Sequence, residues 1–152
     1  MTKRLAEVIA SGFGSGLGPK APATWGSAAA LLVYWALPFE GRGDSPWFFV
    51  LIGVTLFVGT SAANAIITPA DKDPKRCVID EWLGVWATCL FLPATWYWLL
   101  GAFVVFRALD IAKPLGIRQL ERLPGGIGVM ADDLAAGLLG ALILNGVRIA
   151  VA

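Results

Sequence analysis

Four long stretches without a charged residue constrain the fold of this chain more than any other feature. They cover residues 21–39, 45–70, 82–106 and 134–147 of 152. A bilayer core of about 30 Å is crossed by roughly 20 apolar residues in helical form. Charged residues make up 15% of the chain, against about 25% in soluble domains. We therefore expect an all-α, polytopic membrane helical bundle, with a single domain over residues 1–152.

The third stretch contains Pro93, which should end one helix and let the chain turn back. Dividing it there predicts about five helices, at 24–38, 46–68, 78–92, 96–112 and 131–150. Helices of about 15 residues are short for a full crossing, so two of them can be tilted or re-entrant. Residues 1–10 have too short an apolar stretch for a signal peptide, and we expect an interfacial helix there.

An up-and-down path of these helices separates the charges onto two faces. One face receives nine of the eleven acidic residues and ten of the twelve basic ones, at 3, 4, 20, 72, 75, 76, 107, 113, 118 and 122. The other keeps Glu40, Arg42, Asp44 and Arg148. Because an excess of Lys and Arg marks the cytoplasmic side, the first face is expected to be cytoplasmic.

The sequence contains no histidine, and this absence excludes several kinds of chemistry. Serine triads and histidine-dependent phosphatases both need an imidazole. The formal charge of +1 gives no support to nucleic-acid binding. Cys77 and Cys89 are interpreted as small apolar residues. Acid or base work must then come from carboxylates, Lys, Tyr or Cys.

A glycine-rich segment over residues 12–27 is the first motif that could bind a ligand. Glycine occupies positions 12, 14, 16 and 18, and such a segment can present backbone N–H groups to a phosphate. The hydroxyl groups of Ser15, Thr24 and Ser27 are its candidate phosphate contacts. The alternative is a flexible turn followed by a close-packed helix contact.

Two pairs of adjacent carboxylates are expected at the starts of apolar helices. Asp80 and Glu81 open the helix at 78–92, and Asp132 and Asp133 open the one at 131–150 after a second glycine-rich loop. The alternative for both pairs is stabilisation of a helix N-terminus. Neighbouring carboxylates repel each other unless a cation lies nearby, which favours a cation site.

A third set of charges lies at the end of the expected helix 96–112. Arg107, Asp110 and Lys113 are spaced by three residues and share one helix face, and Arg118 follows Pro114. A ladder of internal ion pairs is the alternative. Charges on a membrane helix usually face a partner or a water-filled cavity, because lipid exposure is costly.

All these motifs open onto the same face under the expected topology. The acids Asp80, Glu81, Asp110, Asp132 and Asp133 would then meet the basic side chains of Arg107, Lys113, Arg118 and Arg122. Carboxylates without nitrogen or sulfur ligands suit a hard cation, Mg²⁺ before Ca²⁺ or Mn²⁺. Basic groups and glycine loops beside such a site suit a phosphate ester.

Together the motifs resemble the phosphatidylglycerophosphatase A family. The resemblance rests on residues 12–27, on Val78-Ile-Asp-Glu-Trp-Leu-Gly84, on 106–114 with Ile117-Arg118, and on 125–137. It implies a multi-pass, Mg²⁺-dependent phosphatase of the bacterial cytoplasmic membrane with its active site facing the cytoplasm. The implied reaction removes the terminal phosphate monoester of phosphatidylglycerophosphate, leaving phosphatidylglycerol, and the oligomeric state stays open.

The resemblance also implies roles for individual residues. The acids Asp80, Glu81, Asp110, Asp132 and Asp133 form the catalytic set, and Asp80, Glu81, Asp132 and Asp133 the metal ligands. Arg107, Lys113 and Arg118 are implied phosphate ligands. Attack by a metal-activated water and an aspartyl-phosphate intermediate both remain open.

Other classes of protein were weighed against this interpretation. The Asp-Gly-x-x-Ala-Arg signature of CDP-alcohol phosphotransferases is absent from the sequence. A non-enzymatic membrane binder, or a small ion or phosphate transporter, would also explain acids within membrane helices. Phosphate release from a lipid by the purified protein separates an enzyme from both.

Overall fold

The computed structural model describes residues 1–40, 42–71 and 74–151, and these form an all-helical protein. Lys72 and Asp73, on the expected charged face, lie outside the described residues. The α-helices are α1 Lys3–Ala10, α2 Pro22–Ala36, α3 Pro46–Ile66, α4 Ile79–Thr88, α5 Trp96–Ala112 and α6 Gly126–Val151. Three 3-10 helices join them: η1 Ser15–Leu17, η2 Arg42–Asp44 and η3 Ile117–Arg122. The five helices expected from the sequence correspond to α2–α6, and α1 makes a sixth.

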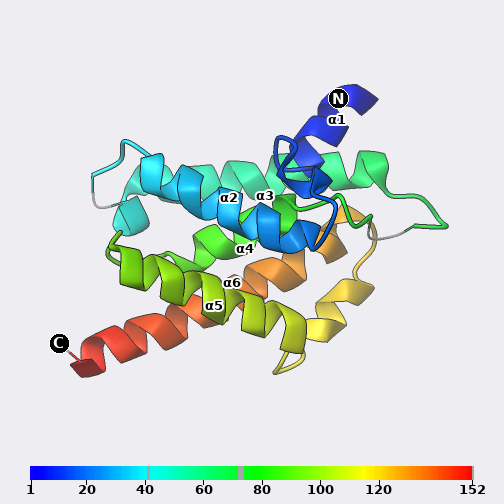
Figure 1. The fold of residues 1–152 in the computed structure, drawn as a ribbon. Helices are drawn as coiled ribbons and strands as arrows, with labels where there is room; N and C mark the ends of the chain where they lie inside the picture. Colours follow the sequence, from blue (N-terminus) through cyan, green and yellow to red (C-terminus); the bar gives the residue numbers. More distant parts are fainter. Residues whose placement is uncertain (41, 72–73, 152) are drawn as a thin grey trace.

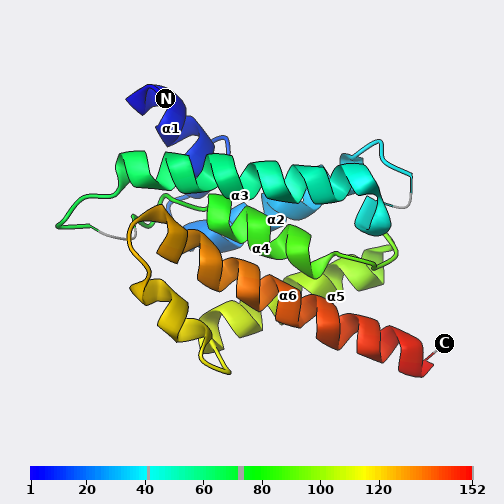
Figure 2. The same cartoon turned by 180° about the vertical axis from the view of Figure 1, so that it is seen from behind.

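Helix α4 is the centre of the molecule. All ten of its residues are buried, and it contacts α2, α3, α5 and α6. Both views show it enclosed between α2 and α3 on one side and α5 and α6 on the other (Figures 1 and 2). Trp86 fixes it to α2 by donating its ring N–H to the carbonyl of Ala30 at 2.9 Å. A helix that is apolar on all sides gains stability only when it is surrounded in this way.

Helix α4 is shorter than the expected helix 78–92. It ends at Thr88, and Phe91 takes a left-handed backbone conformation with φ 61°. The Phe91 N–H donates to the carbonyl of Gly43 at 2.9 Å, so the end of α4 bonds to η2 instead of continuing as helix. Pro93 follows, and α5 runs back in the opposite direction, as the sequence predicts (Figure 1).

Helix α6 begins at Gly126, five residues before the expected start at 131. Its first N–H donates to the side-chain carbonyl of Asn64 in α3 at 2.7 Å. A Cβ atom on Gly126 would lie 2.4 Å from the Thr60 carbonyl oxygen. Gly126 therefore serves close packing of α6 on α3, and Gly128 lies within the helix, against the Leu123 carbonyl. The expectation of a glycine loop up to residue 130 is wrong because tertiary packing overrides the low helix propensity of glycine.

Helices α3 and α6 are the two helices in the described residues that are long and apolar enough to cross a membrane. The 21 residues of α3 rise about 31 Å, close to the thickness of a bilayer core. Large apolar side chains stand exposed on both helices, including Phe57 at 76% and Leu142 at 72%. Such a surface suits lipid better than water.

Candidate active site

The start of α4 carries two acidic side chains into the interior. Val78 precedes the helix, and its N–H donates to the carbonyl of Ala10 at the end of α1 at 2.8 Å. The glycines of segment 12–27 pack here, since a Cβ on Gly16 or Gly26 would lie within 3.0 Å of Val78 side-chain atoms. Asp80 and Glu81 follow and are both less than a tenth exposed. The glycine-rich segment thus positions the start of α4.

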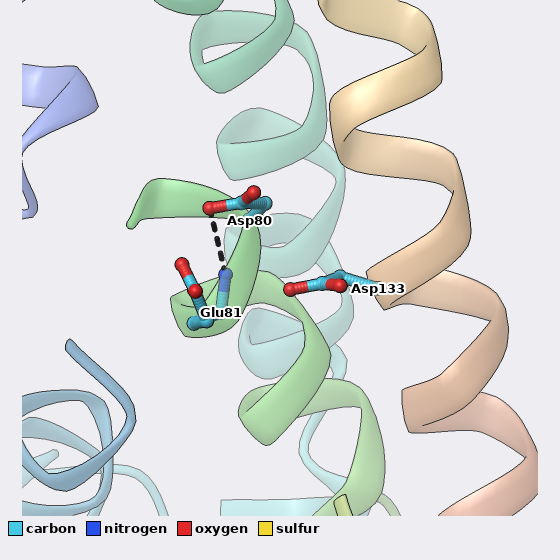
Figure 3. A group of neighbouring side chains, drawn as sticks. All are labelled: Asp80, Glu81 and Asp133. Atoms are coloured by element: carbon cyan, nitrogen blue, oxygen red, sulfur yellow. Dashed lines mark hydrogen bonds between the residues drawn. The ribbon is translucent and has the colours of Figure 1, made fainter. Parts of the chain in front are cut away.

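Helix α6 brings a third carboxylate to this point. Oxygens of Asp80, Glu81 and Asp133 all lie within 4.8 Å of one another, and all three residues are buried (Figure 3). The Glu81 N–H donates to Asp80 Oδ1 at 3.1 Å, which fixes the Asp80 side chain. We call these three residues the carboxylate cluster. A residue of α4 and its direct neighbour share one site here, despite the 100° between consecutive helical side chains.

Glycines allow α4 and α6 to come this close. A Cβ on Gly137 would lie 2.3 Å from the carbonyl oxygen of Gly84, and one on Gly84 would lie 2.2 Å from the Phe106 ring. Gly137 follows Asp133 by one helical turn. The backbone contact therefore sets the distance between Asp133 and the acids of α4.

The donor set of the carboxylate cluster fits a hard cation. Three buried carboxylates so close together repel one another unless a positive charge lies between them. Oε2 of Glu81 is buried and has no hydrogen-bond partner among the described residues. Carboxylate oxygens are the ligands that Mg²⁺ prefers. Asp133 does not stabilise a helix N-terminus, since α6 begins seven residues before it, whereas Asp80 and Glu81 lie in the first turn of α4.

Asp132 lies in a different environment from Asp133. Its Oδ2 accepts a hydrogen bond from Nζ of Lys113, which also bonds Glu121 Oε1 at 2.6 Å. Burial lowers the pKa of Lys113, but the hydrogen bonds and charges of Asp132 and Glu121 outweigh it and leave that pKa raised. Lys113 is therefore a fixed positive charge. The sequence-based metal set contained Asp132, whereas the structure groups Asp80 and Glu81 with Asp133.

A cavity of about 1070 Å³ opens over these residues. Its lining contains all five acids expected from the sequence, Asp80, Glu81, Asp110, Asp132 and Asp133, together with Lys113. Arg107 donates to Asp110 Oδ2 at 2.5 Å and so fixes the position of that carboxylate. Ile67, Leu123 and Val129 add apolar surface to the lining. The cavity thus combines the carboxylate cluster, an ammonium group and some apolar surface.

Five of the expected substrate-binding residues do not line this cavity. Ser15 accepts a hydrogen bond from the Trp82 ring N–H at 3.2 Å, and Ser27 is buried and donates to the Ala23 carbonyl at 2.8 Å. Thr24 and Arg118 are exposed, and Arg107 is paired with Asp110. Of the six, the structure brings only Lys113 to the cavity. Substrate contact by the others stays a prediction.

The structure adds residues that the motifs did not indicate. Lys75 and Glu121 line the cavity, and Asn64 caps α6. Glu121 lies in η3, eight residues after Lys113. Because Pro114 interrupts the helix between them, this spacing does not place the two residues on one helix face. Only the fold of the segment between α5 and α6 brings the two together. Lys75 precedes the segment that leads into α4. In the sequence it belonged to no motif and entered only the count of basic residues on the expected cytoplasmic face.

The combination of a carboxylate cluster with a fixed ammonium group in one cavity is typical of enzymes that act on phosphate esters. The family model described as phosphatidylglycerophosphatase A matches residues 8–148. The chain therefore belongs to the phosphatidylglycerophosphatase A family, and it is a phosphoric monoester hydrolase.

Three relatives match over nearly the whole chain. A Bacteroides thetaiotaomicron protein, provisionally named a phosphatidylinositol-3-phosphatase, is 40% identical over 92% of this chain and 91% of its own. The phosphatidylglycerophosphatase A of Escherichia coli is 38% identical over 90% of this chain and 80% of its own. That of Haemophilus influenzae is 33% identical, over 93% and 87%. No solved structure matches the chain.

Proposed function

We propose that this protein hydrolyses the terminal phosphate monoester of phosphatidylglycerophosphate in an Mg²⁺-dependent reaction. The observation that carries the proposal is the carboxylate cluster beside Lys113 in one cavity. The family and the relatives from E. coli and H. influenzae support the lipid. Family membership favours this reaction over a non-enzymatic binder or a transporter.

The charged side chains around the carboxylate cluster have separate roles in this reaction. Asp80, Glu81 and Asp133 would hold the metal ion. Asp132 positions Lys113 through their hydrogen bond. Bound Mg²⁺ supplies polarisation of the phosphoryl oxygens and an activated water molecule. Lys113 neutralises negative charge on the phosphoryl group. Asp110, held by Arg107, orients the attacking water and accepts its proton.

The protein is proposed to lie in the bacterial cytoplasmic membrane, with the cavity open to the cytoplasm. Exposed apolar side chains on α3 and α6 support burial in lipid, and the ten of twelve Lys and Arg residues in the sequence segments on the side of the cavity support this orientation. The phosphate of the substrate then enters the cavity while its acyl chains stay in the bilayer.

The relative from B. thetaiotaomicron favours a second candidate substrate. Its name assigns it to the 3-phosphate of phosphatidylinositol 3-phosphate, and it is 40% identical to this chain. Both lipids carry a phosphate monoester on a hydroxylated head group, so the same carboxylate cluster and lysine could serve either one.

Phosphate release by the purified protein tests the proposal. Phosphatidylglycerophosphate, phosphatidylinositol 3-phosphate and phosphatidic acid are compared with Mg²⁺, with Ca²⁺ and with excess chelator. We expect release from the first lipid with Mg²⁺, poor support by Ca²⁺ because of its looser coordination, and none with chelator. Full activity in chelator would refute the metal site. Release from phosphatidylinositol 3-phosphate alone would favour the second candidate, and no release from any lipid would favour a binder.

A further inference from the structure

A second cavity lies at the other end of the helical bundle. It measures about 300 Å³ and is lined by η2, by the connection between α4 and α5, and by the last turns of α6, with Arg42, Asp44 and Arg148 as its charged side chains. Along α6, the 16 residues from Asp132 to Arg148 correspond to about 24 Å. The connection of α2 to α3 and the C-terminal end of α6 lie toward the same end of the bundle in both views, opposite the start of α6 (Figures 1 and 2). The reaction proposed above uses none of these residues.

The walls of this cavity are bonded to one another. The Phe91 N–H donates to the Gly43 carbonyl at 2.9 Å, which joins η2 to the α4–α5 connection. Asn145 Nδ2 donates to the Leu90 carbonyl at 2.9 Å, which joins α6 to the same connection. A Cβ on Gly43 would lie 2.5 Å from the Cys89 carbonyl oxygen, so the contact is close. The cavity is thus a built feature of the fold.

Polar atoms at this end lack partners. Nε of Arg148, Oδ1 of Asn145 and the hydroxyl of Tyr34 are buried without a hydrogen bond to any described residue. Arg42 Nε donates to the Leu37 carbonyl at 3.0 Å, which orients its guanidinium group. Within the described part of the chain, no ion pair within 4.0 Å joins Arg42, Asp44 or Arg148. Buried polar groups without protein partners are rare in native proteins, and such groups usually bond to water, an ion or a ligand.

We propose that this second cavity binds the phosphodiester head group of an anionic phospholipid, in the leaflet opposite the first cavity. Guanidinium groups bind phosphate oxygens in pairs. Two arginines minus one aspartate leave a charge of +1, which matches a singly charged phosphodiester better than a doubly charged free phosphate. Asp44 can accept a hydrogen bond from a head-group hydroxyl. The inference rests on the proposed membrane placement and is independent of the hydrolysis.

Thermal unfolding in nanodiscs, followed by tryptophan fluorescence, tests this site. Discs of phosphatidylcholine are compared with discs that also contain phosphatidylglycerol, and inorganic phosphate is added to the first kind in a separate arm. We expect phosphatidylglycerol to raise the unfolding midpoint of the wild type by about 5 °C, and phosphate to raise it little. An equal midpoint in both discs, or an equal rise with phosphate, would overturn the assignment to a lipid head group.

Variants locate the effect. Arg42→Gln and Arg148→Gln should lose the rise caused by phosphatidylglycerol, whatever their midpoint in phosphatidylcholine. Arg4→Gln, in α1, and Asp133→Asn, at the first cavity, should keep it. A rise that persists in both arginine variants, or that disappears in Asp133→Asn, contradicts the second site. Phosphate release from phosphatidylglycerophosphate added to the same discs is measured in parallel, and it separates loss of this lipid site from failure of the proposed reaction.

Discussion

Asp132 and Asp133 are neighbours in the sequence, but they meet different chemistry. Asp133 joins the carboxylate cluster, while Asp132 binds Lys113. Consecutive side chains on a helix diverge by about 100°, and the rotation of α6 against α4 turns Asp133 toward Asp80 and Glu81 while Asp132 faces Lys113. The two residues should therefore respond differently to substitution.

Replacing Asp80 or Asp133 by Asn tests the carboxylate cluster. Asn keeps the size of Asp but removes the charge that holds a cation, so we expect a folded protein whose turnover falls at least about 100-fold. Turnover and the unfolding midpoint are measured together. Glu7→Gln and Glu40→Gln, outside the cavity, should stay near wild type. If both Asn variants lost less than about tenfold, or 1.4 kcal/mol in barrier, the cluster would not be catalytic.

The pairing of Lys113 with Asp132 predicts separate effects on stability and activity. Lys113→Met leaves the nearly buried Asp132 without its partner, and we expect a loss of about 2 kcal/mol in unfolding free energy together with a large loss of turnover. The double variant Lys113→Met/Asp132→Asn should regain most of the stability and none of the turnover. Denaturant unfolding and phosphate release measure the two effects. Recovery of turnover in the double variant would show that Lys113 does not act on the substrate.

At the scale of elements, the contact between α4 and α6 depends on backbone lying against backbone. Gly137→Ala would place a Cβ 2.3 Å from the Gly84 carbonyl oxygen, so the helices must separate. We expect a loss of about 2 kcal/mol in stability and lower turnover, because Asp133 moves with its helix.

Gly146→Ala on the same helix is the matched control. Nothing lies within 4 Å of its Cβ position, and alanine should leave stability unchanged or raise it by up to about 1 kcal/mol. Unfolding midpoints of the two variants under one condition give the comparison. Equal midpoints would show that the close contact of α4 and α6 is unimportant.

The sequence predicted the positions of the helices better than it predicted the structural roles of the glycines. Uncharged runs and Pro93 are local signals, so α3 and α5 appear near their expected bounds. The role of Gly126 depends on Thr60, which faces it from another helix, and no local pattern carries that information. The four paired acids of the cavity were predictable from their position at apolar segments, and Asp110 from its three-residue spacing with Arg107 and Lys113. Which of Asp132 and Asp133 joins the cluster was not, because it depends on how α6 is rotated against α4.

The whole molecule has two chemically different ends joined by apolar helices. If α3 and α6 cross the membrane, the N-terminal segment, Lys75 and Arg118 should face the cytoplasm and Asp44 the opposite side. Single cysteines at 75, 118 and 44 can be labelled with an impermeant reagent in a background where buried Cys77 and Cys89 are replaced. We expect external labelling only at 44. External labelling at 118 would contradict this topology.

The complete burial of α4 has a consequence for how the protein is made. Ten residues rise only about 15 Å, half of a bilayer core, and they include Asp80 and Glu81, so α4 cannot partition into lipid by itself. During synthesis we expect α4 to stay near the membrane surface until the later helices α5 and α6 pack against it. Helix α6 is the last of these, and it also delivers Asp133. The arrival of α6 therefore completes the burial of α4 and assembles the carboxylate cluster in one event, so we expect a chain that ends before α6 to be inactive.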